Sequence, residues 1–135
     1  MTWEATPVVR AMEGLPMWGH ITPFSWYEYI RLPNGKTDLG AIAVLSELVY
    51  WYRPAKDGGR KFKADKLQRS YKQLAAYFHE SVKWARRVVK RLEEQGYITR
   101  ELRTIQCNGR AYSNVLFLEV VPERIIEITK DGRGG

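Results

Sequence analysis

Apolar residues between positions 70 and 96 recur with the spacing of two short amphipathic helices joined by a tight turn. The first helix is predicted to begin at Ser70, which forms a capping-box pattern with Gln73. Ser81 is expected to cap the second helix, and Gly96 to end it in a left-handed conformation. The apolar stripe of the first helix contains Tyr71, Leu74, Ala75 and Phe78. The predicted buried stripe of the second contains Val82, Ala85, Val89 and Leu92.

The opposite face of the second helix is predicted to be almost entirely cationic. Successive helical residues are rotated by about 100°. The outer face therefore carries Lys83, Arg87 and Lys90, flanked by Trp84 and Arg91 on one side and by Arg86 on the other. A basic helix face is often only a solvated surface. A short helix, a tight turn and a second helix with a basic face nevertheless form the arrangement that lays a recognition helix into the major groove of DNA.

Two β-prone runs follow the second helix and predict a hairpin. The first extends from Tyr97 to Arg103 and the second from Ala111 to Val121. The Asn108-Gly109 pair between them favours a tight turn, which places Arg110 and the only cysteine, Cys107, beside the hairpin tip. Two helices followed by a two-stranded ribbon with a basic tip are the order of elements in a winged helix.

A motif at the end of the second helix makes this likeness more specific. The sequence S-x-x-x-x-R-R-x-x-K-R-L-E-E-x-G-Y-I, from Ser81 to Ile98, resembles the junction between recognition helix and wing in bacterial winged helix-turn-helix proteins. DLGAIAVLSELVYWYRP, from Asp38 to Pro54, and the later SYKQLAAYF resemble the DNA-binding domains of phage and plasmid replication initiators and replisome organisers. The resemblance covers roughly residues 22 to 121. It implies an α+β winged helix-turn-helix fold, with a three-helix core and a C-terminal β-hairpin wing.

The remaining pattern predicts the elements that support this motif. Thr37 or Asp38 is expected to cap a largely buried core helix, and residues 24–31 fit either a short helix after Thr22-Pro23 or a strand. The apolar residues of the core helix are Leu39, Ile42, Leu45, Leu48, Val49 and Tyr52. Residues 53–69 are expected to form a long connection with a short first strand, and residues 122–128 a closing helix. The aromatic residues 50–52 are expected to pack on the core, with base stacking as the alternative.

The chain is expected to form one domain with two appendages. Residues 1–21 are interpreted as an extra N-terminal helix or arm of irregular structure, since Trp3, Pro7, Pro16 and Trp18 follow no clear period. The aromatic residues of this arm can pack on the domain, on a second copy or on another protein. Residues 22–128 form the predicted winged helix-turn-helix domain, and residues 129–135 a flexible C-terminal tail.

Positive charge is concentrated in the part of the chain that carries these motifs. The whole chain has 22 basic and 15 acidic residues, a net charge of +7. Residues 53–110 contain sixteen Lys or Arg against six Asp or Glu, a balance of +10, whereas the remainder has six against nine. A basic surface that served only solubility would not be segregated in this way. The pattern therefore favours a polyanionic partner.

The sequence carries none of the usual signatures of catalysis or of a cofactor. His20 and His79 belong to no cluster with metal-ligand spacing, and no phosphate-binding loop or nucleophile elbow occurs. Glu93 and Glu94 diverge on their helix, so they are expected to pair with neighbouring cations and not to share a substrate. We therefore expect no enzymatic activity, no cofactor and no metal. The single cysteine and the lack of a signal peptide or spanning segment favour the cytoplasm, with no membrane partner.

The resemblance and the charge pattern together predict sequence-specific binding of double-stranded DNA. The process served is expected to be transcriptional or replication control of a phage, plasmid or other mobile element. The alternative is a protein–protein interaction module whose basic face binds an acidic partner. Replication or transcription proteins and a second copy of the chain, in a homodimer, are further expected partners.

The expected DNA contacts fall into two groups. Those of the recognition helix are Ser81, Lys83, Trp84, Arg86, Arg87, Lys90 and Arg91. Those of the wing and linker are Arg100, Arg103, Arg110, Lys61, Lys63, Lys66, Arg69 and Lys72. Arg87 is the strongest candidate for a base contact, and Lys90 and Arg91 are expected nearer the phosphates. Arg103 and Arg110 are expected to flank the hairpin tip. Trp84 is expected to touch a thymine methyl or sugar, or to cover the edge of the core.

Overall fold

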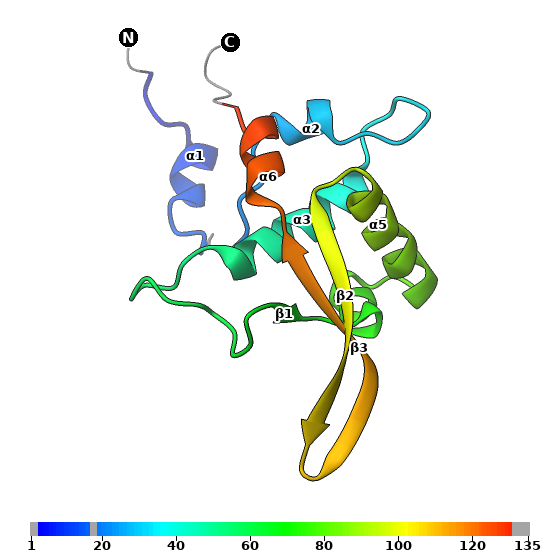
Figure 1. The fold of residues 1–135 in the computed structure, drawn as a ribbon. Coiled ribbons are helices and arrows are strands. Elements are labelled where there is room, and N and C mark those ends of the chain that lie inside the picture. The colour runs from blue at the N-terminus through cyan, green and yellow to red at the C-terminus, as the bar shows by residue number, and fades with distance from the viewer. Residues whose placement is uncertain (1–2, 17–18, 131–135) are drawn as a thin grey trace.

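The computed structural model describes residues 3–16 and 19–130, which form a mixed α+β fold. These residues contain six helices and one three-stranded antiparallel sheet (Figure 1). The helices are α1 (Pro7–Met12), α2 (Trp26–Tyr29), α3 (Leu39–Tyr52), α4 (Tyr71–Phe78), α5 (Val82–Glu94) and α6 (Pro122–Ile128). The strands are β1 (Leu67–Gln68), β2 (Ile98–Cys107) and β3 (Arg110–Val120). The prediction of an α+β fold is confirmed at this level.

α3 is the central helix of the core, as predicted. Asp38 is its cap, since Asp38 Oδ1 accepts a hydrogen bond from the Ala41 amide (3.0 Å). The buried residues of α3 include Ala41, Leu45 and Leu48. Leu39 was expected in this core but is 64% exposed. At about 100° per residue it faces away from Ala41 and Leu48, so the apolar part of α3 is narrower than its sequence suggested.

β3 is the middle strand of the sheet, with β1 on one edge and β2 on the other. Leu67 in β1 confirms the expected short first strand and pairs with Leu118. Tyr52 of α3 ties these two strands together, because its hydroxyl accepts from the Leu67 amide (2.9 Å) and donates to the Leu118 carbonyl (2.5 Å). Burial raises the pKa of Tyr52. The hydroxyl of Tyr52 is thus part of the fold and does not belong to an exposed stacking surface.

The β2–β3 hairpin turns at Asn108-Gly109, as predicted, with positive φ angles of 51° and 76°. The register shifts in the middle of the hairpin: Arg103 pairs with Val115, whereas Ile105 pairs with Tyr112. The extra residue in β3 creates a β-bulge. No residue from position 104 to position 114 is buried. The bulge therefore separates a basal half, which packs on the core, from a distal half that projects beyond the helices (Figure 1).

The bulge residue is Asn114, which has a φ of 56° in the left-handed region. Asparagine tolerates this conformation better than most residues other than glycine. The bulge was not predicted from the sequence, although Asn114 is a poor strand former within an otherwise β-prone run.

The N-terminal part contains two short helices. Residues 26–29 form α2, so the helical alternative for this segment is right and the strand alternative is wrong. Its cap is Ser25, and the expected cap Thr22 shares a hydrogen bond with the Ser46 hydroxyl instead (2.7 Å). Of the two alternatives for the arm, an extra helix or an irregular segment, residues 7–12 take the first as α1, in which Thr6 caps the helix and accepts from the Val9 amide (3.3 Å). Trp18 lies outside the described residues.

The C-terminal helix α6 occupies the predicted range and is followed by two residues that contact α2. Trp26 Nε1 donates to Thr129 Oγ1 (2.9 Å), and the Lys130 amide donates to Ser25 Oγ (2.9 Å). These two residues therefore belong to the folded domain and not to the expected tail. Residues 131–135, the rest of that tail, lie outside the described part of the chain.

Candidate nucleic-acid interface

α4 and α5 are joined by a turn of three residues, which local hydrogen bonds fix. The predicted capping box is present: the Gln73 amide donates to Ser70 Oγ (3.0 Å), and Gln73 Oε1 accepts from the Ser70 amide (2.9 Å). His79 ends α4 in the left-handed conformation, with a φ of 55°. Ser81 caps α5 by accepting a hydrogen bond from the Trp84 amide (3.0 Å). Both predicted caps are confirmed, and the Ser81 hydroxyl is engaged by its own helix.

One face of α5 is buried against the core. It consists of Ala85, Val88, Val89 and Leu92. The predicted stripe is right for three of its four residues, but Val82 is 40% exposed. On the helical wheel Val82 lies at the edge of this stripe, so the first turn of α5 presents it to solvent.

The exposed side of α5 carries Lys83, Arg86, Arg87 and Lys90. With the exposed Lys72 of α4, these residues are called the cationic face below. Among the described residues, no carboxylate lies within 4.0 Å of the charged nitrogens of the first three or of Lys72. Lys90 makes only a 3.9 Å contact with Glu94, between two exposed side chains. The charges of this face are thus largely uncompensated.

Tyr71 connects the cationic face to the base of the hairpin. The guanidinium of Arg86 lies 5.2 Å from the centre of the Tyr71 ring. The Tyr71 hydroxyl accepts a hydrogen bond from Arg100 Nη1 (3.2 Å). Arg100 is also paired with an acidic residue, since its Nε lies 3.6 Å from Glu93 Oε1. The hydrogen bond that Arg100 donates to the Tyr71 hydroxyl is the main reason why the pKa of Arg100 is raised. Tyr71 was predicted only as a core residue, and its role in positioning two cations was missed.

Trp84 covers the edge of the core. Its ring centre lies 5.9 Å from that of Phe78, and a Cβ atom placed on Gly40 would lie 3.2 Å from Trp84 Cζ2. The indole is therefore seated closely on the first turn of α3. This is the second of the two roles that the sequence left open.

Arg91 is engaged inside the protein, in contrast to its expected place near phosphate. Its Nε donates to Asp38 Oδ2 (2.7 Å) and its Nη2 donates to Asp38 Oδ1 (3.1 Å). The side chain of Asp38 is 3% exposed. A bidentate pair with the buried cap of α3 joins the two helices, so Arg91 is not a free cation of α5.

Arg103 is engaged in a similar way and does not flank the hairpin tip. Its Nη1 donates to Asp65 Oδ1 (2.7 Å), and its Nη2 lies 2.9 Å from Glu101 Oε2. The guanidinium also lies over the ring of Phe117, 4.4 Å from its centre. The hydrogen bond from Arg103 lowers the pKa of Asp65 to about 2, and the same contacts raise the pKa of Arg103. It pairs with Val115 in the basal half, before the bulge.

Three of the four expected linker contacts are also occupied. Lys66 Nζ lies 3.3 Å from Glu101 Oε2, and Arg69 Nη2 lies 3.6 Å from the buried Glu47. Lys61 Nζ donates to the Tyr50 carbonyl (2.8 Å). These three cations neutralise or cap groups of the fold, whereas the exposed Lys63 makes no ion pair within the described residues.

Arg110 lies at the hairpin tip, as predicted, and is exposed. No carboxylate of the described chain lies within ion-pair distance of it. Cys107, directly before the turn, is exposed and free. The distal half of the hairpin thus presents one uncompensated positive charge at its end.

The described residues contain no helix long and apolar enough to cross a membrane, and no group of three or more His, Cys, Asp or Glu placed to hold a metal ion. The arrangement that remains is a set of uncompensated cations on α4, α5 and the hairpin tip. Comparisons of the chain with protein families, with curated proteins and with solved structures found no match.

Proposed function

We propose that this chain binds double-stranded DNA, and that its central part is a winged helix-turn-helix with α5 as recognition helix and the β2–β3 hairpin as wing. The element order α3, β1, α4, α5, β2, β3 supports this proposal, because it is the order expected for such a domain. The short capped turn between α4 and α5 also supports it. In this arrangement one side of α5 is exposed along the whole helix.

The observation that carries the proposal is the division of the basic residues into two groups. Arg69, Arg91, Arg103 and Lys66 lie in ion pairs with acidic side chains of the fold. The cations of the cationic face do not, apart from the long contact of Lys90. Uncompensated cations that gather on one helix supply the charge that displaces counterions from phosphates. A solvated helix face of no function would more commonly be interspersed with acidic residues.

α5 has the size and side chains that a major groove accepts. An α-helix with its side chains is about 10–12 Å across, which fits the major groove of B-DNA, about 12 Å wide. The 13 residues of α5 give it a length of about 20 Å along the groove. Lys83 and Arg87 occupy the first two turns, from which recognition helices contact bases. The guanidinium of Arg87 can donate two hydrogen bonds to guanine O6 and N7, worth about 1–3 kcal/mol of discrimination. Lys90, about one turn later, is assigned to the phosphate backbone.

The process that this binding serves is inferred from the resemblance described above. We assign the chain to transcriptional or replication control in a phage, plasmid or other mobile element. Sequencing of genomic fragments retained by the purified protein would supply the binding site, and the genes beside that site would separate a regulator from an initiator.

The first experiment measures the affinity for a labelled duplex at several salt concentrations. If the four cations of the cationic face other than Arg87 contact phosphate, the slope of log K against log salt should be about −3.6, to which Arg110 would add about −0.9. A flat slope, or no binding to any duplex at low salt, would reject the DNA proposal. Binding to an acidic protein with no affinity for duplex would favour the interaction module instead.

The second experiment separates base contacts from phosphate contacts. Arg87→Ala should lower the affinity for the selected site far more than for random duplex, whereas Lys90→Ala should lower both by similar factors. Lys130→Ala removes an exposed cation beyond α6 and is the matched control, with no expected effect. Equal losses on both duplexes for Arg87→Ala would show that Arg87 contacts phosphate and that bases are recognised elsewhere.

A further inference from the structure

The helix α1 contributes no buried residue to the core of the domain. It has six residues, and none of them is buried. Val8 is 72% exposed, and Val9 and Met12 are each 55% exposed. Val8 and Met12 lie four residues apart and so share one side of the helix. A helix this short is unstable in water without tertiary contacts, so α1 needs a surface to pack against.

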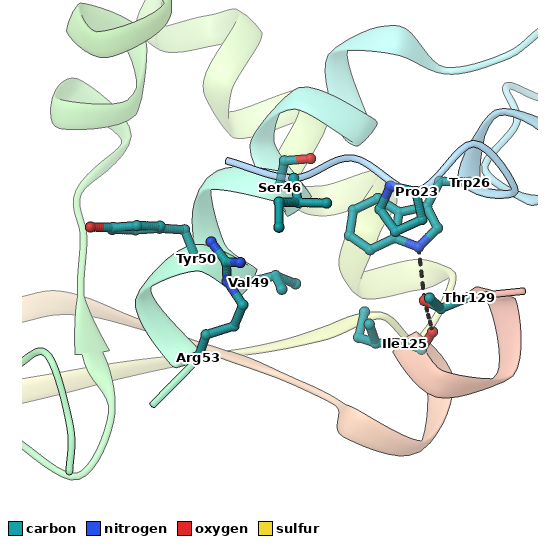
Figure 2. A pocket seen from close by; sticks show the side chains of 9 residues that line it. Pro23, Trp26, Ser46, Val49, Tyr50, Arg53, Ile125 and Thr129 are labelled. Atoms are coloured by element: carbon teal, nitrogen blue, oxygen red, sulfur yellow. Dashed lines mark hydrogen bonds between the residues drawn. The ribbon is translucent and has the colours of Figure 1, made fainter. Parts of the chain in front are cut away.

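An apolar groove between α3 and α6 lies on the same molecule. It consists of two adjoining hollows that share Val49, Arg53 and Ile125. One hollow extends to Trp26, and Figure 2 shows Val49 of α3 and Ile125 of α6 among the side chains that line it. The other extends along the last residues of β3 to the 71% exposed Ile126. We call this surface the α3–α6 groove.

Residues 19–22, which connect the arm of the same chain to the domain, lie at the edge of the groove. Arg53 Nη2 donates to the Gly19 carbonyl (3.4 Å), and His20 Nε2 lies 3.3 Å from the buried carboxylate of Glu47. The shared hydrogen bond of Thr22 with Ser46 fixes the next residues. These contacts hold residues 19–22 against α3, whereas α1 of the same chain remains exposed outside the groove.

We propose that the α3–α6 groove binds α1 of a second copy of this chain, and that two copies exchange their arms in a symmetric dimer. Each copy offers one exposed apolar helix and one empty apolar groove, so a reciprocal exchange satisfies both and closes on two copies. Charges match as well. Arg53 in the groove and Glu13 beside α1 carry opposite charges, and each is without an ion-pair partner among the described residues. Arg10 of α1 likewise forms no ion pair with a described acidic residue.

The dimer leaves the cationic face free. The groove is lined by residues of α2, α3, β3 and α6 and of the segments just before α2 and just after α3 and α6, and none of its lining residues belongs to α4, α5 or the distal hairpin. Figure 1 shows α1, α2 and α6 at the end of the molecule opposite the hairpin tip. The proposal is therefore independent of the proposed function, and it is tested on the protein without DNA.

Light scattering and sedimentation of the full chain are expected to show a dimer. Val8→Asp with Met12→Asp should convert it to a monomer, and so should Ile126→Asp in the groove. All three residues are exposed, so circular dichroism should remain that of the wild type. Leu39→Asp, at an equally exposed position outside the groove, is the control and should leave the dimer intact. A monomer at concentrations up to about 100 µM, or a dimer that resists both variants, would overturn the proposal.

Mixing the two variants distinguishes a second copy from the chain's own arm. The intact arm of Ile126→Asp should enter the intact groove of the Val8→Asp, Met12→Asp chain, so the mixture should regain association. In a Cys107→Ser background, Met12→Cys on one chain should crosslink to Ile126→Cys on another and give a covalent dimer. A crosslink within one monomer that carries both cysteines would show that the groove takes its own arm, and would overturn the exchange.

Discussion

Arg91→Ala is expected to destabilise the protein far more than Lys90→Ala, although the two residues are neighbours on α5. Arg91 donates hydrogen bonds of 2.7 and 3.1 Å to Asp38. Without the guanidinium, the buried carboxylate keeps only the Ala41 amide, at 3.0 Å. Breaking a fully buried ion pair costs about 3–5 kcal/mol. The side chain of Arg91 is 28% exposed, which lets water reach the carboxylate, so we expect a loss of about 2–3 kcal/mol.

Lys90→Ala is the matched control for this loss. It removes a 3.9 Å contact with Glu94 between exposed side chains, which is worth less than about 0.5 kcal/mol. Urea denaturation followed by circular dichroism measures both free energies of unfolding. For a chain of this length the Arg91 loss corresponds to a decrease in Tm of about 6–12 °C.

A double-mutant cycle tests whether the ion pair is the cause. Asp38→Asn removes the charge but keeps an oxygen that can accept from the Ala41 amide. In that background Arg91→Ala should cost less than about 1 kcal/mol, since no buried charge is left behind. If Arg91→Ala unfolds at the same urea concentration as Lys90→Ala, the pair contributes nothing, and Arg91 returns to the candidates for phosphate contact.

Three further predictions concern single side chains. Arg110→Ala should weaken binding to specific and random duplexes alike and reduce the salt slope by about 1; unchanged titrations on both would remove the hairpin tip from the interface. Trp84→Ala should cost about 2–3 kcal/mol in urea denaturation, because the indole seals the core beside Gly40, and unaltered stability would contradict this. In NMR titrations the Asp65 carboxyl should have a midpoint near 2 that moves toward 3.8 in Arg103→Gln. The pair should thus stabilise the fold above the ordinary pKa of Asp65 and cease to do so as the pH falls through about 2, and an unmoved midpoint in the variant would contradict the assignment.

The elements that sequence predicted well are those determined by neighbouring residues. The caps at Ser70 and Ser81 depend on a hydrogen bond three residues away, and the hairpin turn depends on the Asn108-Gly109 pair itself. The exposed cations of α5 follow from the helical period. These features need no information from distant parts of the chain, so a single sequence was enough.

The roles that sequence missed depend on partners far away along the chain. Arg91 and its partner Asp38 are 53 positions apart, and Arg103 and Asp65 are 38 apart. One signal was available for the first pair. Arg91 follows Trp84 by seven residues and lies on the same flank of α5, so a tryptophan that covers the core indicates that its flank faces the protein. α1 could not be placed from the sequence, because six residues carry too little periodic pattern to distinguish a helix from an irregular arm.

The bulge at Asn114 has a consequence for how this protein can change over generations. No residue from position 104 to position 114 is buried, so the basal half is the only part of the hairpin that contributes to the core. Substitutions, insertions or deletions in the distal half therefore cost the fold little stability. Selection can vary the length and side chains of the tip while α5 and the core remain constant. Related chains that act on different partners should accordingly diverge first between the bulge and the turn.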